Sequence, residues 1–382
     1  MSKLTAAVIG TGFIGPVHIE GLKRAGVRVV GILGSSPAKS AAAASKMNLL
    51  RGYASLEALL ADDSVDVVHI TSPNRHHFAQ ATAAIRAGKH VLCEKPLAMN
   101  SRESSELVAL AKSAGVFAGV NYNIRYYPLC IEAAERVACG SLGDLFHVSG
   151  SYSQDWLFKQ TDFNWRVLAD EGGELRAVAD IGTHLLDLIG FITGRRVEAV
   201  FADLQTVYKH RDRPEGEVET FSGKGGNATV STRSIAIDTE DHGSIMLRLA
   251  GGAKGIIWVS QVTAGRKNCL RLELAGSRGS FAWDSESPNS LWLGHRDKAN
   301  ELLTRDPSLM TDRAAHFSSY PGGHNEGFSD TFKQLSRDFY QSIEAGDLNA
   351  KQTYPTFEDG HQEIVLCEAI LKSHREQKWV SV

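Results

Sequence analysis

The sequence lacks the features that mark several protein classes. Its cysteines are odd in number and never lie in CxxC spacing, which favours free thiols in a reducing compartment over a disulfide framework. No apolar run approaches the roughly 20 residues that a membrane-spanning helix needs. The net charge is only -3, and both signs are spread along the chain, so the basic stripe of a nucleic-acid-binding protein is missing. We therefore expect a cytoplasmic protein with neither a membrane nor a nucleic acid as partner.

The composition is otherwise that of an ordinary globular protein, with 43% hydrophobic and 22% charged residues. A chain of 382 residues is too long for one hydrophobic core and fits two domains. The pattern of apolar segments changes at about Tyr122. We therefore expect a first domain over residues 1–122 and a second over 123–382.

Strands and helices alternate in the first expected domain. The predicted strands are Ala6–Ile9, Val27–Leu33, Val65–Thr71, His90–Cys93 and Val116–Val120. One predicted helix follows Gly10 and runs through about Arg24, and the others cover Ser36–Lys46, Ser55–Ala61, Phe78–Ala87 and Ser101–Ser113. Continuous apolar strands that alternate with helices predict a parallel sheet with helices on both faces. This α/β pattern is that of a Rossmann dinucleotide-binding domain.

The second expected domain contains runs of strands separated by turns. The predicted strands are Leu145–Tyr152, Val197–Tyr208, Ser244–Leu249, Gly255–Thr263, Cys269–Ala275 and Ser280–Trp283. Helices are predicted over Ala177–Ile192, Phe328–Ala345 and about 357–376, and the last of these could pack back on the first domain. Such runs predict an α+β domain on an open, mainly antiparallel sheet. One broad face of that sheet needs cover, so we expect this domain to assemble the chain into a homodimer or homotetramer. We also expect this domain to bind the substrate.

A GxGxxG segment lies directly after the first predicted strand and directly before a helix: Gly10, Thr11, Gly12, Phe13, Ile14 and Gly15. The first glycine makes the tight turn, the second lets the backbone approach a pyrophosphate, and the third lets the helix pack on the strand. The helix N-terminus then offers N–H groups to the phosphates. This position predicts a bound dinucleotide.

The end of the second strand indicates which dinucleotide binds. An acidic residue there usually holds the 2′-hydroxyl of NAD, but the sequence contains no acid between Glu20 and Glu57. Ser35, Ser36 and Lys39 could instead hold a 2′-phosphate. We therefore expect NADP rather than NAD. NAD bound through the serines is the alternative, in which Lys39 is merely solvated and Ser36 only caps a helix.

Further motifs follow along the chain. The loop after the third predicted strand reads Ser72-Pro73-Asn74-Arg75-His76-His77, and the loop after the fourth reads Glu94-Lys95-Pro96. The second domain contains Asp180-Ile181-Gly182-Thr183-His184-Leu185-Leu186-Asp187. Together with the GxGxxG segment, these motifs resemble the Gfo/Idh/MocA family, which includes inositol dehydrogenases and glucose–fructose oxidoreductase, over nearly the whole chain. One departure is that residues 174–179 separate Gly172-Gly173 from Asp180, where members usually have only a few residues.

The resemblance implies roles for these residues. Its cofactor contacts are Ser72, Pro73, Asn74, His77, Glu94 and Lys95. Lys95 would also donate to the reacting oxygen, and His184 would be the general acid/base, since an imidazole pKa near 6.5 suits proton transfer at neutral pH. Asp180 would orient His184 or bind an adjacent substrate hydroxyl, because a spacing of four places both on one helix face. Sequence alone leaves open whether Lys95 or His184 holds the proton.

Substrate contacts are expected from residues that mix aromatic faces with hydrogen-bonding groups, as sugar rings favour. Besides Lys95, Asp180 and His184, the candidates are Asn121, Arg125, Tyr126, Trp156, Trp165 and Arg166. We interpret Asp187 as helix-stabilising or interfacial. Ligand-spaced cysteines and an HxxxH pair are both missing, so we expect no metal.

These features predict an NAD(P)-dependent dehydrogenase or reductase. It would move a hydride between the nicotinamide and a secondary hydroxyl, or the ketone, of a sugar, glycoside or cyclitol. One alternative is a glycosidase that uses bound NAD to oxidise C3 transiently. Another is a non-catalytic, cofactor-sensing regulatory protein of the same fold.

Overall fold

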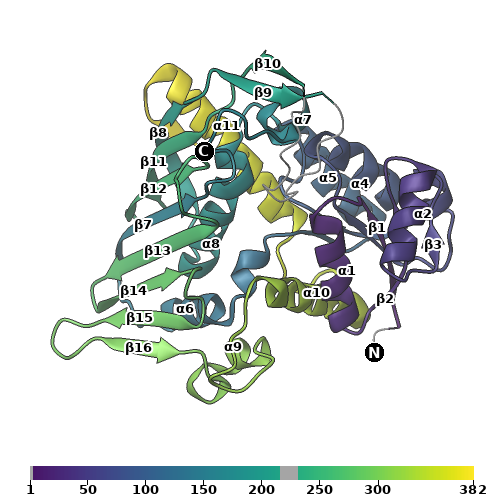
Figure 1. Cartoon of the computed structure of the whole chain (residues 1–382). Helices are drawn as coiled ribbons and strands as arrows, with labels where there is room; N and C mark the ends of the chain where they lie inside the picture. Colours follow the sequence, from purple (N-terminus) through teal and green to yellow (C-terminus); the bar gives the residue numbers. More distant parts are fainter. Residues whose placement is uncertain (1–2, 216–230) are drawn as a thin grey trace. The chain divides into compact units, whose positions relative to one another are not determined.

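A computed structural model describes residues 3–215 and 231–382 of the chain (Figure 1). The described residues form two compact units. The first contains residues 3–123 and 329–364, and the second contains 124–215, 231–328 and 365–382. The chain first passes between the units next to the boundary expected at residue 122. It returns to the first unit over residues 329–364, which include the start of the last predicted helix; the part before that helix was expected in the second domain.

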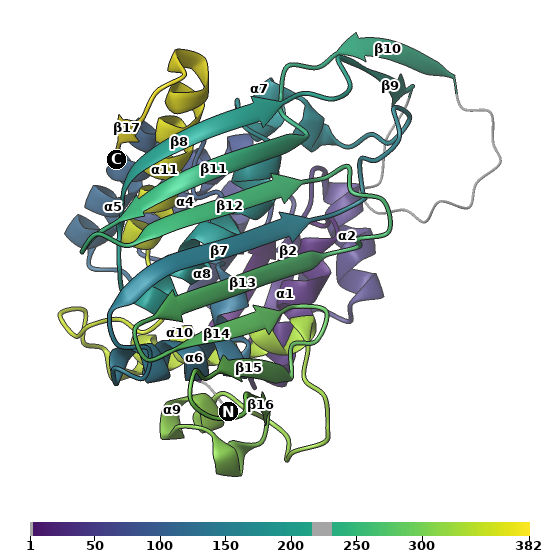
Figure 2. The same cartoon turned by 90° about the vertical axis from the view of Figure 1, so that its left-hand side faces the viewer.

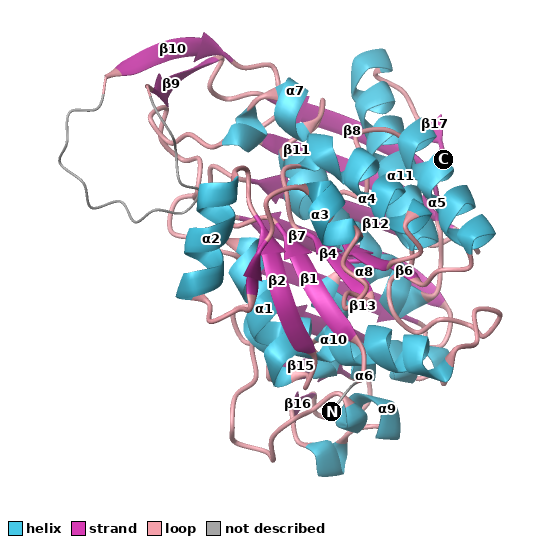
Figure 3. Cartoon of the chain, turned by 90° about the vertical axis from the view of Figure 1, so that its right-hand side faces the viewer, coloured by secondary structure: helices cyan, strands magenta, loops and turns pink. Residues whose placement is uncertain are grey.

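The first unit is built on a parallel sheet of six strands in the order β3-β2-β1-β4-β5-β6 (Figure 3). The strands are β1 (Thr5–Ile9), β2 (Arg28–Leu33), β3 (Arg51–Gly52), β4 (Val67–Ile70), β5 (His90–Cys93) and β6 (Ala118–Val120). Every residue of β4 is buried, which requires cover on both faces of the sheet. The predicted Rossmann arrangement is confirmed, and the C-terminal ends of β1, β4 and β5 lie along one sheet edge.

Helices cover this sheet. They are α1 (Ile14–Arg24), α2 (Pro37–Lys46), α3 (Leu56–Leu60), α4 (His77–Arg86), α5 (Ser101–Ala114) and, from residue 329 onward, α10 (Phe328–Ala345), with the single turn η1 (Asn74–His76) before α4. Their ends follow local chemistry: Asn100 caps α5 by accepting from the backbone N of Glu103, and Gly115 ends it in the left-handed conformation at φ 66°. Helix α10 buries Phe332, Leu335 and Phe339 in this unit.

The second unit is built on a nine-stranded sheet in the order β16-β15-β14-β13-β7-β12-β11-β8-β17 (Figure 2). The strands are β7 (Leu145–Ser153), β8 (Val197–Gln205), β11 (His242–Leu249), β12 (Lys254–Ser260), β13 (Cys269–Gly276), β14 (Gly279–Asp284), β15 (Ser290–Gly294), β16 (Glu301–Thr304) and β17 (Val380–Ser381). Neighbouring strands are antiparallel except for the parallel pair β7 and β12. The predicted mainly antiparallel sheet is confirmed, as one mixed sheet. A separate antiparallel pair joins β9 (His210–Pro214) and β10 (Thr232–Ala236).

The sheet is covered by helical segments, of which α6 (Pro128–Ala138), the π-helical turn η4 (Val178–Gly182) and α8 (Thr183–Thr193) contact its strands, and the later part of α11 (Phe357–Glu376) joins the core. The other helical segments of this unit are η2 (Asn123–Tyr126), η3 (Trp165–Val167), α7 (Ala169–Gly172), η5 (Pro307–Leu309) and α9 (Asp312–His316), which packs on α6. The core lies between this layer and the sheet, where Leu185 and Ile189 of α8 are fully buried with Ile257 of β12. Ile256 and Trp258 alternate with the core residues of β12 and face outward. Within the described residues, none of the helices is long and apolar enough to cross a membrane.

Candidate functional site

The GxGxxG segment forms the turn between β1 and α1, and its three glycines are required for different reasons. Gly10 has a φ of +113°, and a Cβ there would lie 2.6 Å from the backbone oxygen of Thr71. A Cβ on Gly15 would lie 2.2 Å from the oxygen of Gly10. A Cβ on Gly12 would meet no atom within 4 Å. The fold therefore requires Gly10 and Gly15, whereas the free space at Gly12, before the N-terminus of α1, fits a pyrophosphate approaching the backbone.

The residues after β2 offer hydroxyls and an ammonium group. Ser36 caps α2, because its Oγ accepts from the backbone N of Lys39 at 3.3 Å. The side chains of Ser35 and Lys39 are exposed. Ser36 therefore caps the helix, as the alternative interpretation of the sequence expected. The cap uses Oγ as an acceptor, so the hydroxyl proton of Ser36 is available to a ligand.

His77 braces the two loops that follow β4 and β5. Its ring is fully buried, with Nδ1 2.8 Å from the oxygen of Pro96 and Nε2 2.8 Å from the oxygen of Ser72. Burial lowers the pKa of His77, while the two carbonyl groups oppose the shift. These contacts join the Ser72-Pro73-Asn74 motif to the Glu94-Lys95-Pro96 motif. The neighbouring Asn74, another of the predicted cofactor contacts in this loop, is also buried.

Glu94 is buried at the end of β5 with both carboxylate oxygens engaged. Oε1 accepts from His18 Nε2 at 3.0 Å and from Asn121 Nδ2 at 2.5 Å, and Oε2 accepts from the backbone N of Lys95 at 3.1 Å. Burial alone would raise the pKa of Glu94, but His18, Lys95 and Asn121 together lower it to about 2. Glu94 is therefore ionised at neutral pH. The structure thus brings Glu94 and Lys95 together with Asn121, which the sequence analysis had assigned to the substrate.

Asn121 also carries a feature that fits a bound group. Its side chain is 2% exposed, and its Oδ1 atom has no hydrogen-bond partner among the described residues. A buried acceptor without a donor is costly. With the free space at Gly12, this orphaned acceptor makes the first unit a good fit for a dinucleotide that carries an amide group. Gly12 and its neighbours would hold the phosphates, and Asn121 would accept from the amide.

The second unit holds Asp180 and His184 on one continuous helical segment. Asp180 lies in the π-helical turn η4, and His184 lies in the first turn of α8. Single π turns are rare and frequently mark functional sites, and the sequence pattern had predicted an uninterrupted α-helix here. Asp180 Oδ1 lies 3.2 Å from Arg166 Nε, and Gln261 Nε2 donates to Asp180 Oδ2 at 2.9 Å. The His184 ring is 8% exposed and lies 6.4 Å from the ring of Tyr152.

Buried amide side chains next to Asp180 form a network that sequence reasoning missed. Gln261 Nε2 also lies 3.3 Å from Gln154 Oε1, and Gln154 Nε2 donates to Asn268 Oδ1 at 2.8 Å. Tyr152 Oη donates to the same Asn268 oxygen at 2.8 Å. Burial is the main cause that raises the pKa of Tyr152 well above its usual range, so its hydroxyl stays protonated. Tyr152 lies on β7 and Gln154 directly follows it, whereas Gln261 and Asn268 lie between β12 and β13, so no local motif marks them in the sequence.

Residues 174–179, where the chain departs from the family pattern, supply an anchor for this network. Arg176 is fully buried and pairs with Asp241, which also pairs with Arg211 at 2.7 Å. Arg176 Nη1 donates to Gln261 Oε1 at 3.3 Å. The extra residues thus position Gln261, and through it Asp180.

The remaining candidates for substrate contacts lie in different surroundings. Arg166 stacks 4.4 Å over the half-buried ring of Trp165, and Trp156 is also half-buried. Arg125 instead forms a buried ion pair with Asp187, donating from both Nε and Nη2. Tyr126 is 3% exposed and packs edge-on against Phe317. The structure therefore brings Arg166 to Asp180, whereas Arg125 is held in an ion pair and Tyr126 in a ring contact.

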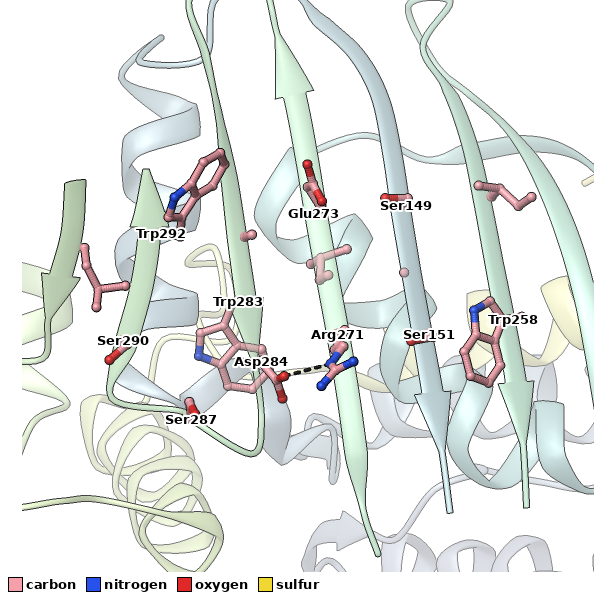
Figure 4. Close-up of a pocket in the computed structure, with 15 residues that line it drawn as sticks. Ser149, Ser151, Trp258, Arg271, Glu273, Trp283, Asp284, Ser287, Ser290 and Trp292 are labelled. Atoms are coloured by element: carbon pink, nitrogen blue, oxygen red, sulfur yellow. Dashed lines mark hydrogen bonds and ion pairs between the residues drawn. The ribbon is translucent and has the colours of Figure 1, made fainter. Parts of the chain in front are cut away.

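The open face of the second unit's sheet contains a shallow hollow of about 540 Å³ (Figure 4). Trp258 and Trp292 lie toward its two sides, and Arg271 on β13 donates to Asp284 on β14 at 2.7 Å between them. Cys269, Asp284 and Glu286 are close enough together to hold a metal ion. Both carboxylates, however, are already bound by arginines, Asp284 by Arg271 and Glu286 by Arg266. This cluster is therefore a poor metal site.

The fold and the glycine turn define a dinucleotide-binding protein, and the comparisons identify the class of oxidoreductase to which it belongs. Residues 4–122 match the oxidoreductase family with an NAD-binding Rossmann fold, and residues 130–282 match the GFO/IDH/MocA C-terminal domain. The chain belongs to the GFO/IDH/MocA family of oxidoreductases. It is an NAD(P)-dependent enzyme of that family.

Named relatives cover the whole chain. Levoglucosan dehydrogenase from Pseudarthrobacter phenanthrenivorans is 27% identical over 100% of this chain and 99% of its own. Myo-inositol 2-dehydrogenase from Thermotoga maritima is 25% identical over 98% of this chain and 97% of its own. The solved structure of levoglucosan dehydrogenase in complex with NADH and L-sorbose has a TM-score of 0.88 at 26% identity, covering 100% of this chain and 99% of that one.

Proposed function

We propose that this protein transfers a hydride between a nicotinamide dinucleotide and a secondary hydroxyl, or the corresponding ketone, of a sugar, glycoside or cyclitol. The observation that carries this proposal is the pair Asp180 and His184 on one helical segment, held among buried amide side chains, in a chain whose other unit has the glycine turn of a dinucleotide site. The sugar and cyclitol substrates of the named relatives support the same class. A panel of sugars, glycosides and inositols, assayed for reduction of both nucleotides, tests it.

The chemistry assigns a task to each residue. When bound, the nicotinamide would accept the hydride that leaves the carbinol carbon. His184 takes the hydroxyl proton while the C–H bond breaks and the C=O bond forms. Lys95 donates a hydrogen bond to the same oxygen and so lowers the pKa of the alcohol. Asp180, held by Arg166 and Gln261, binds a neighbouring hydroxyl through its remaining lone pairs.

Specificity is assigned to the residues around Asp180. Arg166, Trp165 and Trp156 offer a guanidinium group and aromatic faces, which suit the hydroxyls and C–H faces of a sugar ring. Because Arg125 is bound by Asp187, we assign it to positioning rather than to substrate contact.

The two alternatives make different demands. An NAD-dependent glycosidase would cleave its substrate without net reduction of added nucleotide. A cofactor-sensing regulator would bind the nucleotide without turnover. A regulator needs no group that takes a hydroxyl proton, so the set Lys95, Asp180 and His184 favours an enzyme over the regulator. The stoichiometry of nucleotide reduction separates the dehydrogenase from the glycosidase.

For the cofactor, we propose a preference for NADP over NAD, and we propose that no metal takes part. Lys39→Ala should raise the Kd for NADPH by about 3- to 10-fold while leaving that for NADH unchanged, because only NADPH offers a 2′-phosphate to an exposed ammonium group. Fluorescence titration with both nucleotides measures this. Lys46→Ala, at the other end of α2, is the matched control. Equal losses for both nucleotides, or no loss, would return Lys39 to a merely solvated role.

We propose that the open face of the nine-stranded sheet binds a second copy of the chain, giving a homodimer or homotetramer. Ile256, Trp258 and Leu302 are 55%, 39% and 63% exposed on or beside this face, and exposed apolar side chains gathered on one face are typical of protein–protein interfaces. Ile256→Glu should lower the sedimentation coefficient at micromolar concentration to that of a monomer. Leu50→Glu, at a leucine that is even more exposed (68%) and lies in the first unit, should not. A wild-type monomer at that concentration would contradict this assignment.

We also propose a cytoplasmic location. All five cysteines are free thiols, and Cys93, Cys130 and Cys269 are buried. Free, buried thiols are typical of proteins kept in a reducing compartment. No nucleic acid or membrane is expected as a partner.

A further inference from the structure

A chain of buried hydrogen bonds runs through the first unit and ends on Glu94. His18 of α1 contacts Glu94 Oε1 through Nε2 at 3.0 Å, and its Nδ1 lies 3.0 Å from Nδ1 of His69 on β4. His69 Nε2 lies 3.1 Å from Tyr340 Oη on α10. His18, His69 and Tyr340 are at most 2% exposed. None of the three has a part in the chemistry assigned above.

The direction of the hydrogen bonds follows from the charges. Glu94 is ionised, so its oxygens only accept and His18 Nε2 must carry a hydrogen toward it. Burial and the neighbouring His18 lower the pKa of His69 well below its usual range, so His69 is neutral. A neutral His69 offers one donor and one acceptor, which its contacts with His18 and Tyr340 use. Whether the hydrogen between the two Nδ1 atoms belongs to His18 or to His69, His18 Nε2 donates to Glu94.

We infer that His18, held by His69 and Tyr340, is a positioning residue that fixes Glu94 and thereby the backbone of Lys95. Glu94 transmits this constraint because its other oxygen accepts from the backbone N of Lys95 at 3.1 Å. His18 lies in α1, whose N-terminus follows the glycine turn, so the same side chain ties the phosphate-binding helix to the turn that presents Lys95. The part of this inference that concerns catalysis rests on the proposed function.

The aromatic surroundings support a fixed position for His18. The Phe332 ring of α10 packs edge-on at 5.2 Å from the His18 ring, and the His69 ring lies 5.3 Å away at 81°. A Cβ on Gly21, one turn after His18, would lie 3.0 Å from Phe332 Cβ, so α1 and α10 approach closely at this point. A histidine enclosed in this way has one orientation, as a positioning role requires.

Two substitutions of similar polarity separate this role from simple burial of a polar group. In His18→Gln the side-chain amide N replaces Nε2 and can still donate to Glu94. In His18→Asn the shorter amide replaces only Nδ1 and cannot reach Glu94. We expect His18→Asn to speed amide hydrogen exchange at Lys95 and to lower kcat by roughly 10- to 100-fold, because a hydrogen bond to a buried charge is lost. The Kd for NADH should change by less than about 3-fold, since the phosphate contacts persist. His18→Gln should stay within about 5-fold of wild type in kcat.

His90, the first residue of β5, provides a control variant. His90→Asn, at the opposite end of β5 from Glu94, should leave both exchange at Lys95 and kcat unchanged, since its Nδ1 accepts only from Phe117 N. Equal behaviour of the Gln and Asn variants, or wild-type exchange at Lys95 in the Asn variant, would overturn the inference. Tyr340→Phe, which removes one buried hydroxyl, should increase amide exchange at Lys95 by less than His18→Asn does. Wild-type exchange in Tyr340→Phe would overturn the role assigned to His69 and Tyr340.

Hydrogen exchange also separates this inference from the proposed function. It is measured on the whole protein without any substrate, so it reports on Lys95 even if no sugar is oxidised. Faster exchange in His18→Asn together with an inactive wild type would count against the proposed substrate class alone.

Discussion

Replacing His184 with alanine is expected to lower kcat by about 10²–10⁴-fold, the usual cost of removing a general acid/base. The variant should also lose the pH dependence of kcat/KM near neutrality, because that dependence reports the ionisation of the imidazole. Cofactor affinity should stay near wild type, since the glycine turn belongs to the first unit. Steady-state kinetics across pH and fluorescence titration with the reduced nucleotide measure these effects.

A matched control is available on the same unit. His147 is an exposed histidine on β7, and His147→Ala should leave kcat and its pH profile unchanged. Near wild-type turnover of His184→Ala on the true substrate would mean that the proton goes elsewhere, with Lys95 as the next candidate.

Double substitution tests whether Lys95 and His184 act on one hydroxyl. Lys95→Ala alone should cost a similar factor in kcat, and the double variant should lose much less than the product of the two factors, because groups that act as a unit are not additive. Fully multiplicative losses would contradict a shared hydroxyl. Asp180→Asn should raise KM strongly if Asp180 binds the substrate, and should mildly lower kcat if it only orients His184.

The second large effect is expected at Gly12. Gly12→Val should abolish binding of both nucleotides while leaving the fold intact, because a Cβ there meets no protein atom within 4 Å but occupies the approach of the pyrophosphate. Isothermal titration measures the binding, and thermal unfolding measures the stability. Normal cofactor affinity in this variant would contradict the assignment of the site.

Gly15 provides the contrasting control. A Cβ there would lie 2.2 Å from the backbone oxygen of Gly10, so Gly15→Ala should lower the free energy of unfolding by about 1–3 kcal/mol or more. A loss of stability at Gly15 and a loss of binding at Gly12 would together show that the two glycines serve the fold and the ligand respectively.

The first unit was well predicted from sequence because its signals are local. Continuous apolar strands, the glycine turn and the loops after β4 and β5 all lie within short windows. Two features were missed. Strand β3 has only two residues, both exposed, and gives no apolar pattern. Helix α10 was recognised as a helix but assigned to the second domain, because its periodicity shows which face is buried and not which core receives it.

In the second unit, several of the missed elements have an ambiguous sequence pattern, although strand β15, which alternates between half-buried and buried residues, was missed as well. Helix α6 starts with Pro128, a favourable first helical residue, but the charged Glu132 is buried together with its apolar neighbours, so residue polarity does not mark the buried face. Strand β16 is largely exposed and lacks a buried alternation. The pair β9 and β10 is short and polar, which resembles a loop.

The site residues likewise divide into those that a local motif marks and those that only the fold brings together. Lys95, Asp180 and His184 belong to motifs, whereas Gln154, Gln261 and Asn268 are single amides that meet only in the folded chain. His18 did leave a signal, since it lies three residues after Gly15 and shares the buried face of α1 with Ile19 and Leu22. A histidine on an apolar helix face needs a partner. That partner, Glu94, is 76 residues away and can be identified only from the structure.

The most direct test of the account is the stoichiometry of turnover on the sugar that gives the highest rate in the substrate panel. Reduced nucleotide is followed by its absorbance, and the carbohydrate product is identified by mass spectrometry. We expect one reduced nucleotide for each secondary hydroxyl converted to a ketone, with the carbon skeleton and any glycosidic bond intact. Cleavage of a glycosidic bond without net nucleotide reduction, or nucleotide binding without turnover of any sugar, glycoside or cyclitol, would contradict it.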